Sequence, residues 1–272
     1  MEYGVKTDTG RVRGNNEDSF GVAPELNLFV LSDGMGGKAS GEIASQITTE
    51  EIVAHCRDAN ADANFTFVGT RIPDVSETSN RLVSAIRRAN QEIRDAAERH
   101  PEHEGMGATV VAAWIRGDRM SLAHIGDSRA YRLRNSSLEQ LTQDHSFIAE
   151  QVRQGVITAE DADKSQMHNV LLRALGVDAE VEIDVNEELI IEGDTFLLCT
   201  DGLTREASDA QIAAILEEAD DAQQAADQLV DFANQAGGND NITAIVLRSA
   251  PRAVGVAGHV GRFGRWLVGA SS

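Results

Sequence analysis

The chain is poor in cysteine, and this limits the compartment in which it is expected to work. Cys56 and Cys199 are its two cysteines among 272 residues. Two thiols are too few for a disulfide framework, and their surroundings predict a helix at the first and a buried strand at the second. We therefore expect a reducing compartment, specifically the cytoplasm.

The sequence contains no long apolar run and nothing that resembles a secretory leader. No stretch reaches the ~18 apolar residues that a membrane-spanning helix needs. Residues 1–10 are polar and charged where a signal peptide would be apolar. We expect no transmembrane segment, and the length suits one large domain followed by a tail.

Positive charge is scarce. The formal net charge is −20, with 24 basic residues against 44 acidic ones. Such a surface repels a phosphate backbone, so we expect no nucleic acid partner. Acidity also suits a protein that binds divalent cations, although its commoner role is solubility. The seven histidines lack the paired spacing of a zinc site and are expected to be structural or exposed.

Hydrophobic periodicity predicts strands and helix pairs in separate blocks. The expected strands are 3–7, 19–23, 26–31, 108–116, 119–125, 130–134, 138–141, 195–200 and 242–248. The expected helices are 39–57, 77–99, 208–218 and 221–236, and residues 144–186 mix short helical pieces with loop. This order favours an α+β protein with antiparallel sheets covered by helix pairs over a parallel, doubly wound sheet.

Four acidic residues share one local setting, an apolar strand that stops beside glycine or asparagine. They are Asp33, Asp127, Asp201 and Asp240, and Glu17 with Asp18 stands just before another strand. Carboxylates at strand ends can converge on one rim, where protonation or bound cations relieve their repulsion. Hard oxygen ligands favour Mg²⁺ or Mn²⁺.

Glycine and arginine add to this pattern. Gly34 and Gly202 follow their aspartates, where glycine permits a sharp turn and leaves its carbonyl free to approach a metal. A single Asp-Gly pair is usually just a turn, but its recurrence after apolar strands favours a metal site. Arg13 could bind a phosphate with its planar guanidinium, although a lone arginine is more often a surface charge.

Seven motifs, in this order, resemble the bacterial branch of the protein phosphatase 2C family. They are Arg13-Gly-Asn-Asn-Glu-Asp18, Ser32-Asp-Gly-Met-Gly-Gly37, Gly107-Ala-Thr109, Gly126-Asp-Ser-Arg129, Leu141-Thr-Gln-Asp-His-Ser146, Thr200-Asp-Gly202 and Gly238-Asn-Asp-Asn-Ile-Thr243. The resemblance covers roughly residues 1–249. It implies a four-layer α/β/β/α sandwich, two antiparallel sheets with a helix pair on each outer face, and hydrolysis of phosphoserine and phosphothreonine in proteins.

The resemblance also implies roles for particular residues. Asp33 would bridge two core ions, Mn²⁺ or Mg²⁺, and the remaining roles follow by motif. Asp201 and Asp240 would bind the first ion, the Gly34 carbonyl and Glu17 the second, Asp18 a metal-bound water, and Asp127 with Asp201 a weaker third ion. Arg13 would bind phosphate. The expected partners are phosphorylated proteins and a cognate Ser/Thr kinase, whose action a monomeric enzyme would oppose.

The implied mechanism is attack on phosphorus by a hydroxide that bridges the two ions, with an acid protonating the leaving oxygen. Met35 stands where the better-known eukaryotic members carry histidine, so the acid remains open. Our hypothesis is a metal-bound water positioned by Asp127 and Asp201. Residues 144–186 correspond to the mobile flap of the family and are expected to contact the protein substrate.

Three other functions have some support in the sequence. Cys199 and Arg205 have the spacing of thiolate phosphatases, but Asp201 between them would repel phosphate. Residues 34–39 fit a loose dinucleotide fingerprint, which is weak alone. A catalytically weak, phosphoprotein-binding regulatory module would keep the fold without turnover, although all expected acids are present.

The last residues differ in character from the rest. Residues 250–272 form a Gly-rich basic tail without an acidic residue. Repeated glycine opposes a stable helix, so the tail is expected to be flexible. The alternative is a docking or membrane-surface segment.

Overall fold

The structure is a computed structural model that describes residues 1–36, 40–62, 64–162, 167 and 170–249. Its strands are β1 (Glu2–Asp8), β2 (Asp18–Ala23), β3 (Leu28–Met35), β4 (Gly107–Ala108), β5 (Val110–Arg116), β6 (Arg119–Ile125), β7 (Arg129–Arg134), β8 (Ser137–Gln140), β9 (Asp184–Leu189), β10 (Thr195–Cys199) and β11 (Ile242–Arg248). Its helices are α1 (Ser40–Ala61), α2 (Glu77–Arg99), α3 (Phe147–Arg153), α4 (Ala159–Ala162), α5 (Asp201–Thr204), α6 (Asp209–Glu218) and α7 (Ala222–Ala236), with a 3₁₀ turn at Pro101–His103.

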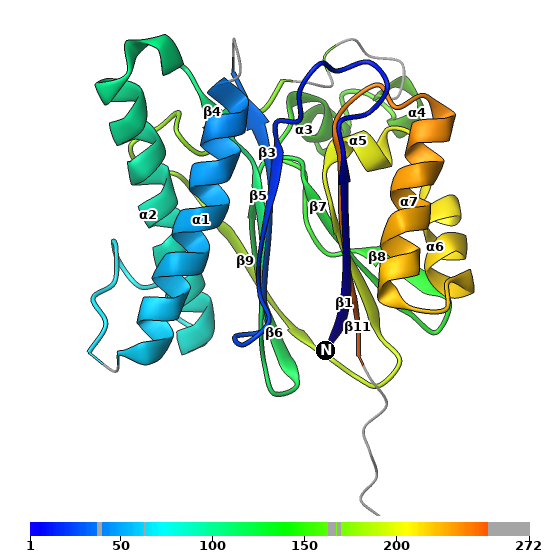
Figure 1. The fold of residues 1–272 in the computed structure, drawn as a ribbon, viewed down its shortest axis with the longest axis horizontal. Coiled ribbons are helices and arrows are strands. Elements are labelled where there is room, and N and C mark those ends of the chain that lie inside the picture. Colours follow the sequence, from blue (N-terminus) through cyan, green and yellow to red (C-terminus); the bar gives the residue numbers. More distant parts are fainter. Residues whose placement is uncertain (37–39, 63, 163–166, 168–169, 250–272) are drawn as a thin grey trace, which may run out of the picture.

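The strands form two antiparallel sheets that face each other. One sheet has the order β1-β11-β10-β7-β8, and the other has the order β2-β3-β5-β6-β9, with β4 paired to β3. Figure 1 shows α1 and α2 on the outer face of the second sheet and α6 and α7 on the outer face of the first. The expected four-layer sandwich is therefore confirmed. Within the described residues, no helix is both long and apolar enough to cross a bilayer.

Three apolar layers hold the four structural layers together. Phe29, Leu198 and Ile245 belong to the layer between the sheets. Leu82 and Ile86 of α2 pack with the outer face of the second sheet, and other side chains fill the space beneath α6 and α7. Central strands are buried on both faces, because one face meets the other sheet and the other face meets the helices. Successive side chains point to opposite faces, so both sets are apolar. This is why the central strands appear in the sequence as continuous apolar runs.

Local signals place the helix starts. The Ser76 side chain accepts a hydrogen bond from the Ser79 amide at the start of α2, and Asp221 does the same for Gln224 at the start of α7. These side chains satisfy amides that have no partner inside the helix. The expected helices 77–99 and 221–236 begin within one residue of these caps.

Two features of the strands differ from the prediction. The sequence does not predict β9, and its first three residues fall in the stretch 144–186 that is expected to mix helical pieces with loop, because Asp-Val-Asn-Glu-Glu-Leu has few apolar residues. β9 forms because its backbone pairs with β6 at the edge of the sheet, a contact that needs little apolar surface. β3 was expected to stop at Leu31 but continues through Met35, where β4 pairs with it. The tail 250–272 lies outside the described residues.

A close approach between β1 and α7 gives the first prediction. A Cβ atom on Gly4 would lie 2.3 Å from the Ala222 carbonyl oxygen, which is backbone and cannot move aside like a flexible side chain. We expect Gly4→Ala to lower the free energy of unfolding by about 1–3 kcal/mol. Urea denaturation measures this, with Gly14→Ala as the control, because a Cβ there meets nothing within 4 Å. Equal stability of both variants would contradict the packing described.

Candidate metal centre

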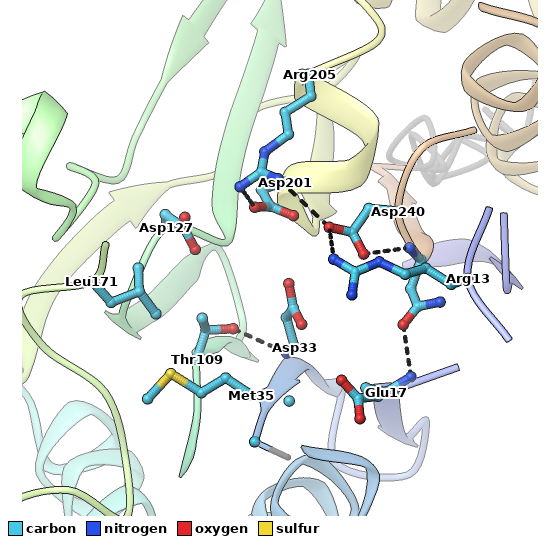
Figure 2. Close-up of a pocket in the computed structure, with 13 residues that line it drawn as sticks. Arg13, Glu17, Asp33, Met35, Thr109, Asp127, Leu171, Asp201, Arg205 and Asp240 are labelled. Carbon is cyan, nitrogen blue, oxygen red and sulfur yellow. Dashed lines mark hydrogen bonds and ion pairs between the residues drawn. The ribbon is translucent and has the colours of Figure 1, made fainter. Parts of the chain in front are cut away.

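Strand ends from both sheets meet at one rim and surround a cavity of about 210 Å³. Its lining includes Arg13, Glu17, Asp33, Gly34, Met35, Thr109, Asp127, Leu171, Asp201, Arg205, Asp240 and Asn241. Figure 2 shows Arg13, Glu17 and Asp240 gathered on one side, and Met35, Thr109 and Leu171, with Asp127 beside them, on the other. The structure thus brings seven of the eight expected site residues to one cavity, and Asp18 lies beside it.

Asp33 is held by the strand pairing and by a threonine. The Asp33 amide donates to Thr109 Oγ1 at 3.0 Å, and the Thr109 amide donates to the Asp33 carbonyl at 2.8 Å. Thr109 Oγ1 also lies 2.7 Å from Ser128 Oγ. The motif residue Thr109 therefore positions the central carboxylate.

Gly34 and Gly202, which follow their aspartates, do not form turns, and this part of the sequence interpretation was wrong. Gly34 lies within β3 and Gly202 within α5. A Cβ on Gly34 would lie 1.9 Å from the Gly41 carbonyl oxygen of α1, and one on Gly202 would lie 2.0 Å from the Asn241 carbonyl oxygen. Glycine is required at these positions because another backbone segment packs directly against them. Gly126, with φ +99°, does adopt a turn conformation.

Asp18 carries an oxygen without a hydrogen-bond partner. Its Oδ2 accepts from Thr200 Oγ1 at 3.0 Å and from Thr243 Oγ1 at 2.7 Å. Its Oδ1 is buried and has no partner. A buried carboxylate oxygen left in this way is costly unless a cation or water satisfies it.

Asn241 fixes the loop that presents Glu17. Its Oδ1 accepts from the Glu17 amide at 2.8 Å, and its Nδ2 donates to the carbonyls of Thr9 and Asn15. Sequence reasoning placed Asn241 beside an acid but gave it no role. Only the tertiary structure shows that it joins residues more than 220 positions apart.

The carboxylates resist ionisation. Burial raises the pKa of Asp18 to about 7 and that of Asp127 to about 8. Burial, and then repulsion by Asp18 and Asp201, raises the pKa of Asp33 well above its ordinary value. Burial also raises the pKa of Asp201, and nearby Arg205 opposes that rise. A cation among these groups would replace their protons.

Known proteins share these motifs and this fold. The family model for protein phosphatase 2C matches residues 11–246. The chain belongs to the protein phosphatase 2C family. The serine/threonine phosphatase stp of Listeria monocytogenes is 36% identical over 250 residues, covering 91% of this chain and 95% of that relative. PstP of Mycobacterium tuberculosis is 37% identical over 246 residues, covering 90% of this chain and 44% of that protein.

Solved structures agree with this membership of the protein phosphatase 2C family. The crystal structure of the M. tuberculosis phosphatase PstP/Ppp has a TM-score of 0.79 at 36% identity, covering 91% of this chain and 98% of that one. The catalytic domain of PstP in complex with two manganese ions has a TM-score of 0.75 and 36% identity. The chain is a metal-dependent serine/threonine protein phosphatase, so its substrates are phosphoproteins.

The phosphatase residues fit divalent cations. The rim offers carboxylate and carbonyl oxygens, which are the ligands of Mg²⁺ and Mn²⁺. The buried, unpartnered Asp18 Oδ1 is an independent sign that the site is built for a further group.

A second cluster in this phosphatase joins His124, His145 and Asp184, whose ligand atoms all lie within 4.8 Å of one another. Its atoms already have partners. His145 Nδ1 accepts from the Gly126 amide at 3.2 Å, while His145 Nε2 lies 3.3 Å from Asp184 Oδ2. Arg173 donates to Asp184 Oδ1 at 2.9 Å, and its positive charge opposes a cation here. The cluster is structural, as expected for these histidines, and supports the turn that carries Asp127.

The thiolate and nucleotide alternatives were wrong for this phosphatase. The Cys199 side chain is fully buried in the layer beneath α6 and α7, and burial raises its pKa to about 12. A thiolate nucleophile needs an accessible thiol with a lowered pKa. The sheets are antiparallel, so the parallel frame of a dinucleotide fold is absent from the described residues. Arg205 was noticed in the sequence only for its spacing from Cys199, yet it lines the cavity.

The raised pKa values predict how this phosphatase responds to pH in a chelator. A carboxyl with a raised folded-state pKa stabilises the fold fully below about pH 4, the ordinary Asp pKa. This contribution is lost as pH rises through about 7 for Asp18 and about 8 for Asp127. We therefore expect the free energy of unfolding to fall between about pH 6.5 and pH 8.5. The fall is up to ~1.4 kcal/mol per pH unit for each carboxyl that is still protonated in the folded protein but ionised in the unfolded chain.

Urea denaturation at several pH values, in EDTA and in Mn²⁺, measures this effect. The lowered pKa values of His124 and His145 cost stability only below about pH 6.5, so this range excludes them. Saturating Mn²⁺ is expected to flatten the dependence. Stability that stays level or rises with pH in EDTA would contradict the raised aspartate pKa values.

Proposed function

We propose that this phosphatase binds two cations, Mn²⁺ or Mg²⁺, with Asp33 between them. Asp201 and Asp240 complete one position, and Glu17 with the Gly34 carbonyl completes the other. The observation that carries this assignment is the convergence of these oxygens, from separate elements of both sheets, on one cavity.

Asp18 and Asp127 complete the proposed site. The unpartnered Asp18 Oδ1 holds water at the rim, since its other oxygen is engaged by two threonines. Asp127 with Asp201 takes a weaker third ion. Its support is the position of Asp127 on the cavity wall, within electrostatic reach of Asp201.

The proposed reaction is hydrolysis of a phosphoserine or phosphothreonine ester. Bound cations supply Lewis-acid activation of water and neutralise phosphate charge. Arg13 binds phosphate oxygens with its guanidinium, which reaches the cavity from the exposed side and already contacts Asp240 Oδ2 at 2.9 Å. Met35 and Leu171 form an apolar part of the cavity wall.

The leaving oxygen needs a proton, because an alkoxide is a poor leaving group. Met35 has no proton to give. We assign the positioning of the proton donor to Asp127 and Asp201. Both are carboxyl groups of the cavity, and both have raised pKa values.

The first test is phosphate release from a phosphothreonine peptide in Mn²⁺ and in EDTA. We expect EDTA to abolish turnover and Asp201→Asn to reduce kcat by roughly 100-fold or more, about 3 kcal/mol, because a charged ligand is lost. Asp231→Asn, on the exposed side of α7, is the control and should leave kcat unchanged. Phosphopeptide binding without turnover in the natural chain would instead favour the regulatory-module alternative.

The second test concerns the proton donor. Asp127→Ala is expected to slow hydrolysis of the phosphothreonine peptide by about 100-fold or more. The same substitution should slow hydrolysis of an aryl phosphate much less, because the phenolate oxygen of that substrate departs without protonation. Steady-state rates on both substrates give the comparison.

Two results of that comparison would count against the assignment. If hydrolysis of both substrates slowed equally, Asp127 would have no role in proton transfer and would act only in cation binding. Unchanged turnover of the peptide would remove it from both roles.

We propose that the enzyme is a monomer in the cytoplasm. There it dephosphorylates proteins that a cognate Ser/Thr kinase phosphorylates. The two buried, unpaired cysteines support a reducing compartment. We further propose that residues 144–186 contact the substrate, since Leu171 lines the cavity and neighbouring Leu172 is half exposed.

A further inference from the structure

Arg205 lies at the C-terminal end of α5, one turn after Asp201, and its side chain turns back toward the acids. Its guanidinium forms an ion pair with Asp201 Oδ2 and lies 3.5 Å from Asp240 Oδ2. Figure 2 shows Arg205 and Arg13 on either side of Asp240. Two positive side chains therefore share the carboxylates at one end of the cavity.

These ion pairs are partly withdrawn from water. The side chain of Asp201 is 13% exposed and that of Arg205 is 33% exposed. Such pairs are stronger than pairs on the open surface, because screening by water is reduced. Arg205 also favours the ionised form of Asp201 against the effect of burial on its pKa.

The same contacts affect how the acids are spaced. Two oxygens that share one cation at ~2.1 Å are at most about 4.2 Å apart. Across the described residues, no three acids of the cavity bring ligand atoms within 4.8 Å of one another, whereas His124, His145 and Asp184 do. Asp201 and Asp240 are thus paired with arginine rather than gathered around a common point with Asp33.

We propose that Arg205 is an internal counter-ion that competes with cations for Asp201 and Asp240. This inference rests on the ligand assignment made above. The guanidinium must give up its contacts, or at least share both carboxylates, before a cation can bind them. The same interaction therefore stabilises the protein in a chelator and weakens its affinity for the metal, since only net differences in binding appear in the measured affinity.

The opposite role is also physically reasonable, and it predicts the opposite result. If Arg205 mainly orients Asp201 toward the cations, its loss would disorder a ligand and weaken metal binding. The sign of the change in affinity decides between the two roles.

The experiment measures Mn²⁺ binding by calorimetry to the metal-stripped natural chain and to Arg205→Gln and Arg205→Lys. We expect Arg205→Gln to bind Mn²⁺ roughly three- to tenfold more tightly, in keeping with the loss of one partly exposed ion-pair competitor. Arg205→Lys keeps the positive charge, so its Mn²⁺ affinity should be closer to that of the natural chain. Thermal unfolding provides the second measurement. Arg205→Gln should lower the melting temperature in EDTA, and saturating Mn²⁺ should reduce that deficit.

The matched control is Arg132→Gln. Arg132 also pairs with two carboxylates, Glu139 and Glu188, but does not line the cavity. Its loss should leave Mn²⁺ affinity unchanged and lower the melting temperature equally with and without metal.

The possible failures are distinguishable. Unchanged or weaker Mn²⁺ binding by Arg205→Gln, with normal binding by the natural chain, would overturn the role of Arg205 alone. A natural chain that binds no Mn²⁺ would overturn the ligand assignment, and the inference with it. Tighter binding by Arg132→Gln as well would show a general charge effect and would also overturn the inference.

Discussion

Mutual repulsion among carboxylates at one rim of the sandwich is the constraint on which the active site depends. Asp33, Asp127 and Asp201 come from different strand ends and line one small cavity. Burial and this repulsion raise their pKa values, so the site favours protons, cations or arginine. The three apolar layers of the fold supply the free energy that holds such groups together.

Neutral side chains set the positions of the charged ones. Thr109 holds the backbone of Asp33, Thr200 and Thr243 hold Asp18, and Asn241 holds the amide of Glu17. All four lie within the motifs that carry the family resemblance. Much of each motif therefore serves to orient its acid, since hydrogen bonds with uncharged side chains position the acid without adding charge to a crowded site.

The cavity has two chemically different sides. Arg13, Arg205 and Asp240 form a charged side, and Met35 with Leu171 forms an apolar one. Met35 cannot donate a proton, which is why the proposed mechanism assigns the positioning of the proton donor to Asp127 and Asp201. The proposed phosphate and cation positions lie on the charged side, and Leu171 on the apolar side belongs to the stretch 144–186.

The amino-acid sequence was enough to predict most of the strands and helices, the fold class and the acids that line the cavity. Central strands were visible because both of their faces are buried, and each expected acid stood at a strand end or directly before a strand. The polar edge strand β9 was missed, since backbone pairing with β6 leaves little trace in residue type. Only the tertiary structure showed why Gly34 must be glycine, what Asn241 joins and where Arg205 points. These are contacts between distant segments, and local patterns of hydrophobicity and spacing do not encode which segments meet.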